Sequence, residues 1–66
     1  MRTIIVRNGI TYSASQDRRG LSSEADLIIN EGITEIYRRS HPKFQTKEEM
    51  AEASLEIIEE ILRRSR

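Results

Sequence analysis

The first fourteen residues alternate between short apolar runs and a turn. Thr3–Val6 and Ile10–Ala14 are rich in β-branched or apolar side chains that favour extended structure, and Asn8-Gly9 lies between them. Asparagine followed by glycine accepts the positive φ angles of a type I′ turn, so this dipeptide is a strong hairpin signal. Residues 1–14 therefore predict a β-hairpin.

After a polar stretch, 15–21, which predicts a loop, the apolar spacing changes to that of a helix. Apolar positions recur at three- and four-residue steps behind a pair of serines that can cap a helix. The segment 22–40 is thus predicted to form a first helix, interrupted by Gly32. Pro42 disfavours helical geometry in the residue before it, so 41–45 is predicted to be a loop. The apolar positions are Ala25, Ile28, Ile29, Ile33, Ile36 and Tyr37.

A second helix is predicted over 46–66. Thr46 and Glu49 have the spacing of a capping box, in which each residue satisfies a free backbone N–H of the other. Arginines at the end of the segment complement the exposed carbonyls of a helix C-terminus. The short connection 41–45 favours antiparallel packing of the two helices. The apolar stripe comprises Met50, Ala51, Ala53, Leu55, Ile57, Ile58, Ile61 and Leu62.

Together these elements predict an α+β fold in a single domain, 1–66: a β-hairpin followed by an antiparallel two-helix hairpin, in the order ββαα. Sixty-six residues form only a small interior, and the chain has no cysteine for a disulfide. The stripe of 46–66 is wider than one neighbouring helix needs, so we expect a homodimer. The residues predicted to form its contact are Ile57, Ile58, Ile61 and Leu62.

Zero formal net charge conceals an uneven distribution of charge. Residues 48–60 carry six glutamates and no basic residue. Glu48, Glu52 and Glu56 recur every four residues and form one ridge of the predicted second helix. A solvated face is one interpretation of this ridge, and a contact surface for another protein is the alternative.

The start of the chain, 1–20, is basic, with four arginines and one aspartate. Arginine binds phosphate and guanine through paired hydrogen bonds, and a two-stranded ribbon can enter a major groove. Pairing of these arginines with glutamates of the helices is the alternative interpretation, which zero net charge favours. The candidate nucleic-acid contacts are Arg2, Arg7, Arg18 and Arg19.

No residue pattern indicates catalysis, a cofactor or a metal site. His41 is the only histidine, and without cysteine the chain lacks the ligands of a conventional zinc site and the members of a nucleophilic triad. The three glycines are scattered and form no phosphate-binding loop. The N-terminus does not have the composition of a signal peptide, and no apolar run is long enough to span a membrane, so we expect a cytoplasmic protein.

These features favour a small non-enzymatic interaction protein, a dimeric regulator, adaptor or inhibitor that acts through protein contacts. The alternative is a dimeric DNA-binding transcriptional regulator that uses the arginine-rich hairpin. Titration of duplex DNA at low and moderate salt separates the two hypotheses, because phosphate contacts weaken steeply with salt. A small enzyme with a site between subunits is a third class, for which no residues stand out.

Overall fold

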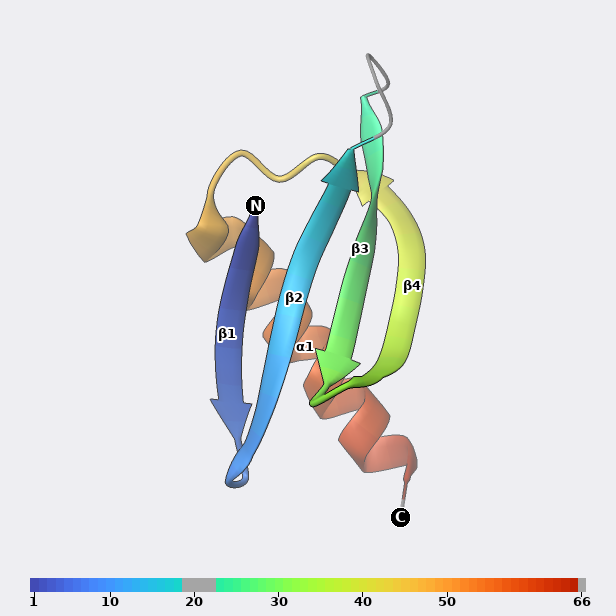
Figure 1. Ribbon diagram of the computed structural model, residues 1–66. Helices are drawn as coiled ribbons and strands as arrows, with labels where there is room; N and C mark the ends of the chain where they lie inside the picture. The colour runs from blue at the N-terminus through green and yellow to red at the C-terminus, as the bar shows by residue number, and fades with distance from the viewer. Residues whose placement is uncertain (19–22, 66) are drawn as a thin grey trace.

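The computed structural model describes residues 1–18 and 23–65, and of Arg18 only the backbone. Within this part of the chain, four antiparallel strands form one sheet and a single helix follows them. Each strand pairs with the next along the chain, so the sheet is a meander in the order β1-β2-β3-β4 (Figure 1). The elements are β1 (Arg2–Arg7), β2 (Ile10–Arg18), β3 (Glu24–Glu31), β4 (Thr34–Pro42) and α1 (Lys47–Arg64).

The predicted ββαα arrangement is wrong, because the segment assigned to a first helix, 22–40, contains β3 and most of β4. The apolar residues that β3 buries lie at every second position, namely Ala25, Leu27 and Ile29, whereas the buried Asp26 projects from the other face toward Arg38. A period of two belongs to a strand with one covered face. The apparent three- and four-residue spacing arises from neighbouring isoleucines, whose β-branched side chains suit an extended backbone.

The turn between β3 and β4 explains Gly32, which the helical prediction treats as an interruption. Gly32 has a φ of +61° and begins the two-residue turn Gly32-Ile33. Two-residue hairpin turns of type II′ have glycine at this position. Ile33 is 101% exposed, so this member of the predicted helical stripe makes no apolar packing contact. The helical hairpin is therefore replaced by a second β-hairpin.

The N-terminal hairpin has the turn that its sequence indicates, with φ angles of 54° at Asn8 and 74° at Gly9. Its second strand is longer than predicted, because β2 continues through Arg18 into the segment assigned to a loop. This extension pairs with β3, where Arg18 lies opposite Ala25. Strand β2 therefore pairs with a strand on each side. The polar composition of the predicted loop, 15–21, does not by itself indicate this pairing. The remainder of the predicted loop, 19–21, and Ser22 lie outside the described residues.

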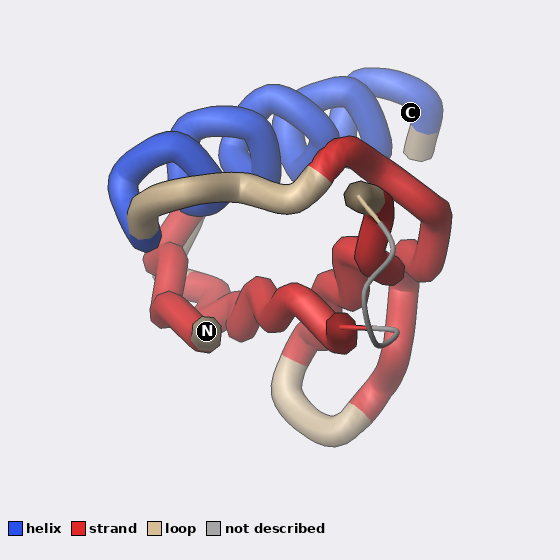
Figure 2. Tube along the Cα trace, turned by 90° about the horizontal axis from the view of Figure 1, so that it is seen from above, coloured by secondary structure: helices blue, strands red, loops and turns tan. Residues whose placement is uncertain are grey.

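Helix α1 covers one face of the sheet, and the core lies between them (Figure 2). Six side chains form the buried cluster, four from β2 and β3 and two from α1, each at most 1% exposed. They are Tyr12, Ala14, Leu27, Ile29, Met50 and Ile58. Successive strand residues alternate between faces, so the residues between these project from the other side of the sheet, which we call the open face.

The start of α1 is held by local and distant hydrogen bonds. The Oγ1 of Thr46 accepts a hydrogen bond from the backbone N–H of Glu49 at 3.1 Å, which is one of the two bonds of the predicted capping box, and the Glu49 carboxylate accepts from the Thr46 hydroxyl at 3.3 Å. Before it, the buried side chain of Gln16 accepts from the N–H of Phe44 at 2.6 Å and donates to the Phe44 carbonyl at 3.4 Å. The chain thereby crosses from β4 to the β1 side of the sheet, where α1 begins (Figure 1, Figure 2).

Ser54 tests the packing beneath α1, because it is fully buried and its Oγ has no hydrogen-bond partner within the described residues. We expect Ser54→Ala to raise the free energy of unfolding by roughly 1–3 kcal/mol, since alanine removes the desolvation penalty of an unsatisfied hydroxyl. Urea unfolding followed by circular dichroism measures the change. In the same assay Ile58→Ala is expected to lower stability by about 2–5 kcal/mol. A Ser54→Ala variant less stable than the parent would contradict the prediction.

Tyr12 predicts a loss of stability at alkaline pH. Burial raises the pKa of its phenol above the ordinary value, and the charge and hydrogen bond of Glu31, opposite Tyr12 on β3, raise that pKa further. The unfolded chain loses this proton first, so the free energy of unfolding falls as the pH rises above about 10. Urea unfolding of the parent and of Tyr12→Phe, compared at about pH 8 and about pH 10.5, measures the effect. Tyr12→Phe should lose less stability than the parent over this interval, and an equal loss in both would contradict the assignment.

Candidate functional site

A groove of about 590 Å³ runs between α1 and β4. Four partly buried apolar side chains form its floor. Ile36 and Tyr37 come from β4, and Ile57 and Ile61 come from α1. We call this feature the α1/β4 groove. Its floor thus depends on two segments that are some twenty residues apart in the sequence and meet only in the folded chain.

A β-bulge sets the strand side of the groove. Ile29 lies opposite Tyr37 whereas the next residue, Asn30, lies opposite Glu35, so Ile36 is an extra residue in β4. A bulge redirects side chains and bends the strand locally. Consecutive residues of a regular strand face opposite sides, yet Ile36 and Tyr37 both pack against the core cluster. The bulge therefore adds a second apolar side chain to the groove.

The two rims of the groove carry charges of opposite sign. On the strand rim, the guanidinium carbon of Arg39 lies 5.9 Å from the centre of the Tyr37 ring. On the helix rim, the Glu60 carboxylate lies 3.3 Å from Arg64 Nε. Arg39 and Glu56 form no ion pair within the described residues. Each rim therefore retains one charge that a partner can neutralise.

The structure places the four residues predicted for association in different surroundings. Ile58 is 1% exposed in the core, and Leu62 packs against the core cluster. Ile57 and Ile61 line the α1/β4 groove. The sheet covers much of the apolar stripe of α1 that is predicted to contact a second copy. It can do so because β3 and β4 form where a helix is predicted, which makes the sheet wider.

The predicted acidic ridge is present on α1. Glu48, Glu52 and Glu56 are exposed, and none of them forms an ion pair within the described part of the chain. Glu60 continues the ridge but is held by Arg63 Nη2 at 2.6 Å as well as by Arg64. Since Glu56 also lines the α1/β4 groove, the acidic surface and the apolar floor adjoin.

The arginines proposed to contact nucleic acid do not form one surface among the described residues. Arg2 projects from the open face, next to Ser15 of β2. Arg7 projects from the covered face, where its Nη2 lies 2.8 Å from the carboxylate of Glu59. Pairing with a helix glutamate, the alternative interpretation of these arginines, thus occurs at Arg7. The Arg18 side chain and Arg19 lie outside the described residues.

Strand β1 provides a second surface, whose exposed side chains are not among the site residues predicted from the sequence, although the predicted hairpin is expected to offer an edge for pairing with a second copy. It forms one edge of the sheet, and Ile4 and Val6 project from its open face, 58% and 66% exposed. Ile5 faces the other way and packs against the core cluster. The apolar run of β1 contains both kinds of position, so this run by itself does not show which are exposed. The alternation of apolar and polar residues along the neighbouring strand β2 is the sequence signal that shows which face of the sheet is covered.

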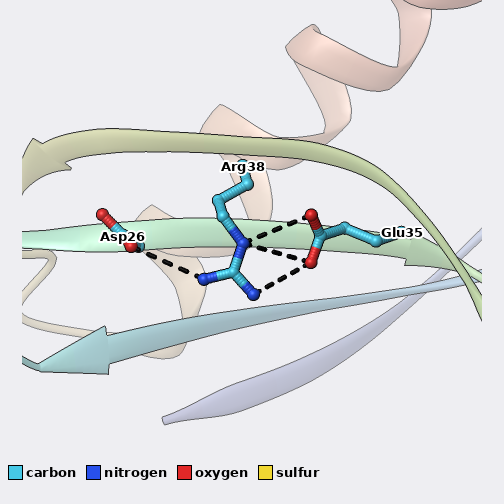
Figure 3. Close-up of polar contacts among 3 residues, drawn as sticks. All are labelled: Asp26, Glu35 and Arg38. Carbon is cyan, nitrogen blue, oxygen red and sulfur yellow. Dashed lines mark hydrogen bonds and ion pairs between the residues drawn. The ribbon is translucent and has the colours of Figure 1, made fainter.

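A polar cluster centred on Arg38 lies on the open face over β3 and β4 (Figure 3). Arg38 Nη2 is 2.9 Å from Glu35, and Nη1 is 3.5 Å from Asp26. The hydrogen bonds and the charge of Glu35 raise the pKa of Arg38. Asp17 lies opposite Asp26 on the neighbouring strand, so Arg38 offsets a cross-strand repulsion. Among the described residues no three histidines, cysteines or carboxylates are arranged to hold a metal.

This ionic cluster supports a prediction about stability. Arg38→Met removes the ion pair with Asp26 and the positive charge that attracts Asp17, so the variant should unfold at a lower urea concentration than the parent. Arg39→Met is the matched control, because Arg39 forms no ion pair within residues 1–18 and 23–65. The difference in urea midpoint between the two variants is measured at low and at moderate salt. This difference should become smaller at moderate salt, because salt screens the repulsion between the carboxylates. Equal midpoints for both variants would show that the cluster contributes nothing.

Three surfaces thus form the candidate site: the α1/β4 groove, the acidic ridge that adjoins it, and the edge strand β1. Within the parts of the chain described above, no helix combines the length and the apolar composition required to cross a membrane. Comparison with known proteins adds no relative from which a role could be transferred. No protein-family model, curated protein or solved structure matches this chain.

Proposed function

We propose that this chain is a non-enzymatic interaction protein, a small regulator, adaptor or inhibitor that binds a segment of a partner protein in the α1/β4 groove. The observation that carries this proposal is the composition of the groove. Its floor is apolar on both the strand and the helix side, and its rims retain charges without an ion pair among the described residues. Concave apolar surfaces with a few polar groups at their edge are typical binding sites.

The acidic ridge indicates the chemistry of the partner. Glu52 and Glu56 are exposed on α1 without basic partners in the described chain. A segment that carries apolar side chains for the floor and lysine or arginine for these glutamates fits the surface. Apolar contacts at the centre supply most of the affinity of such interfaces, whereas complementary charges at the rim select the partner and speed association.

The edge position of β4 supports an extended conformation for the bound segment. Among the described strands β4 pairs only with β3, so its outer backbone groups are available. An extended peptide can hydrogen-bond along such an edge and direct alternate side chains to one face. Pro42 lacks a backbone N–H and ends the strand, and the bulge interrupts it at Ile36, so pairing is expected over the regular stretch between them, beside Tyr37.

A protein partner is favoured over duplex DNA by the distribution of charge. Arg2 and Arg7 project from opposite faces of β1, and Arg7 is paired with Glu59. The helix rim of the groove is acidic, which opposes phosphate. Nucleic-acid binding generally requires a broad basic surface, and the neutral net charge of the chain does not provide one.

Selection from a displayed library of random peptides of about twelve residues tests this function. We expect enriched peptides to alternate apolar residues with lysine or arginine. Ile61→Asn should weaken binding of a selected peptide by roughly tenfold or more, because it places a polar group in the floor. Glu56→Lys should weaken it by about two- to fivefold, and more at low salt.

Ile33→Asn is the matched control, since Ile33 is fully exposed at the β3–β4 turn and does not line the groove. Thermal unfolding of each variant verifies that the fold is retained. Selected peptides whose affinity is unchanged by both Ile61→Asn and Glu56→Lys would place binding elsewhere and overturn the proposal. Duplex DNA binding that weakens steeply with salt, with no peptide enriched, would support the DNA-binding alternative instead.

A further inference from the structure

Strand β1 is an edge that neither a bulge nor a proline interrupts, and its one inward-facing charge, Arg7 at the end of the strand, is paired with Glu59. Among the described residues it pairs with β2 alone, and its register is continuous from Arg2 to Arg7. Natural edges are protected by bulges, proline, lysine or inward-facing charge. Strand β4, at the other edge, has a bulge and ends in Pro42. Strand β1 is therefore the edge better suited to continuous pairing with another strand.

The side chains of β1 point to a partner that also covers the open face. Ile4 and Val6 expose more than half of their surface there. β-Branched side chains pack well against one another across paired strands, and cross-strand apolar pairs stabilise a sheet. An added strand that presents apolar β-branched residues at the matching positions would cover both.

We propose that the added strand is β1 of a second copy, paired antiparallel about a two-fold axis at Ile5. Directly opposed residues of antiparallel strands project from the same face of the sheet. In a pair of identical strands related by a two-fold axis, the residue at the axis lies opposite the same residue of the other copy. With the axis at Ile5, Ile4 of each copy lies opposite Val6 of the other, and both exposed side chains are covered. With the axis at Ile4, Arg2 lies opposite Val6, which places a charged side chain against an apolar one.

The charges of the chain are compatible with this register. Thr3 of one copy lies opposite Arg7 of the other, so no like charges face each other, and each Arg7 already has Glu59 as its counter-ion. The formal net charge of the chain is zero, so no long-range repulsion opposes self-association. The axis is perpendicular to the sheet, and both copies of α1 therefore lie on the same side of a continuous eight-stranded sheet, twice the four strands of one copy.

The length of β1 limits the strength of the dimer. A six-residue edge covers less area than the roughly 1,200–2,000 Å² of stable protein interfaces. The dimer is thus expected to be reversible and to form as concentration rises. The α1/β4 groove lies at the other edge of the sheet, so it remains free in both copies.

Sedimentation velocity over a range of concentrations up to about 1 mM tests the dimer. The mass should rise from 7.7 kDa toward twice that value. Val6→Lys should raise the dissociation constant roughly tenfold or more, because it places a charge opposite Ile4 of the second copy. Ile33→Lys, a lysine at a fully exposed apolar position away from β1, is the matched control and should leave the dissociation constant unchanged.

Disulfide trapping tests the register, since the chain has no cysteine of its own. An oxidised mixture of Ile4→Cys and Val6→Cys chains should yield mainly the mixed disulfide, measured by mass spectrometry. A disulfide formed predominantly by Ile4→Cys with itself would place the axis at Ile4 and overturn the proposed register. A strictly monomeric chain at every concentration, or a dimer unchanged by Val6→Lys, would overturn the interface. Ile61→Asn should leave the dimer intact, which separates this test from that of the groove.

Discussion

The path of this chain depends on the buried amide of Gln16. Its oxygen and nitrogen bind the backbone N–H and carbonyl of Phe44, at 2.6 and 3.4 Å. Buried backbone groups without partners are strongly disfavoured, so the segment between β4 and α1 stays where both bonds can form. That location is over β2, and the chain therefore leaves one edge of the sheet and begins α1 near the other (Figure 1). The helix then has to return diagonally across the covered face.

This diagonal course produces the surfaces that remain for partners. Met50 in the first turn of α1 and Ile58 further along close the core, while the second half of the helix lies beside β4 and forms the α1/β4 groove. The same half reaches the lower end of β1, where Glu59 pairs with Arg7. One face of the sheet is thereby covered and the other is left open. The groove and the β1 edge lie at opposite sides of the sheet, so binding of a partner and self-pairing do not compete for the same residues.

Prediction from sequence succeeded where a few neighbouring residues decide the structure. Asn8-Gly9 adopts the positive φ angles of its turn, and Thr46 caps α1 through Glu49. Prediction failed over 22–40, because isoleucines at adjacent positions satisfy the period of a helix and the β-propensity of a strand at once. Gly32 is compatible with both interpretations. A helix can tolerate a glycine and a tight turn can require one, and the sequence does not distinguish the two cases.

By itself, the sequence determined the first turn, the start of α1 and its acidic ridge, because each depends on residues within about four positions of one another. Only the tertiary structure decided that Ile58 belongs to the core, that Ile61 lines a groove and that Val6 is exposed. These outcomes depend on which face of the sheet α1 covers. That choice rests on contacts such as the one from Gln16 to Phe44, 28 positions apart, and no local pattern of residues encodes such a distance.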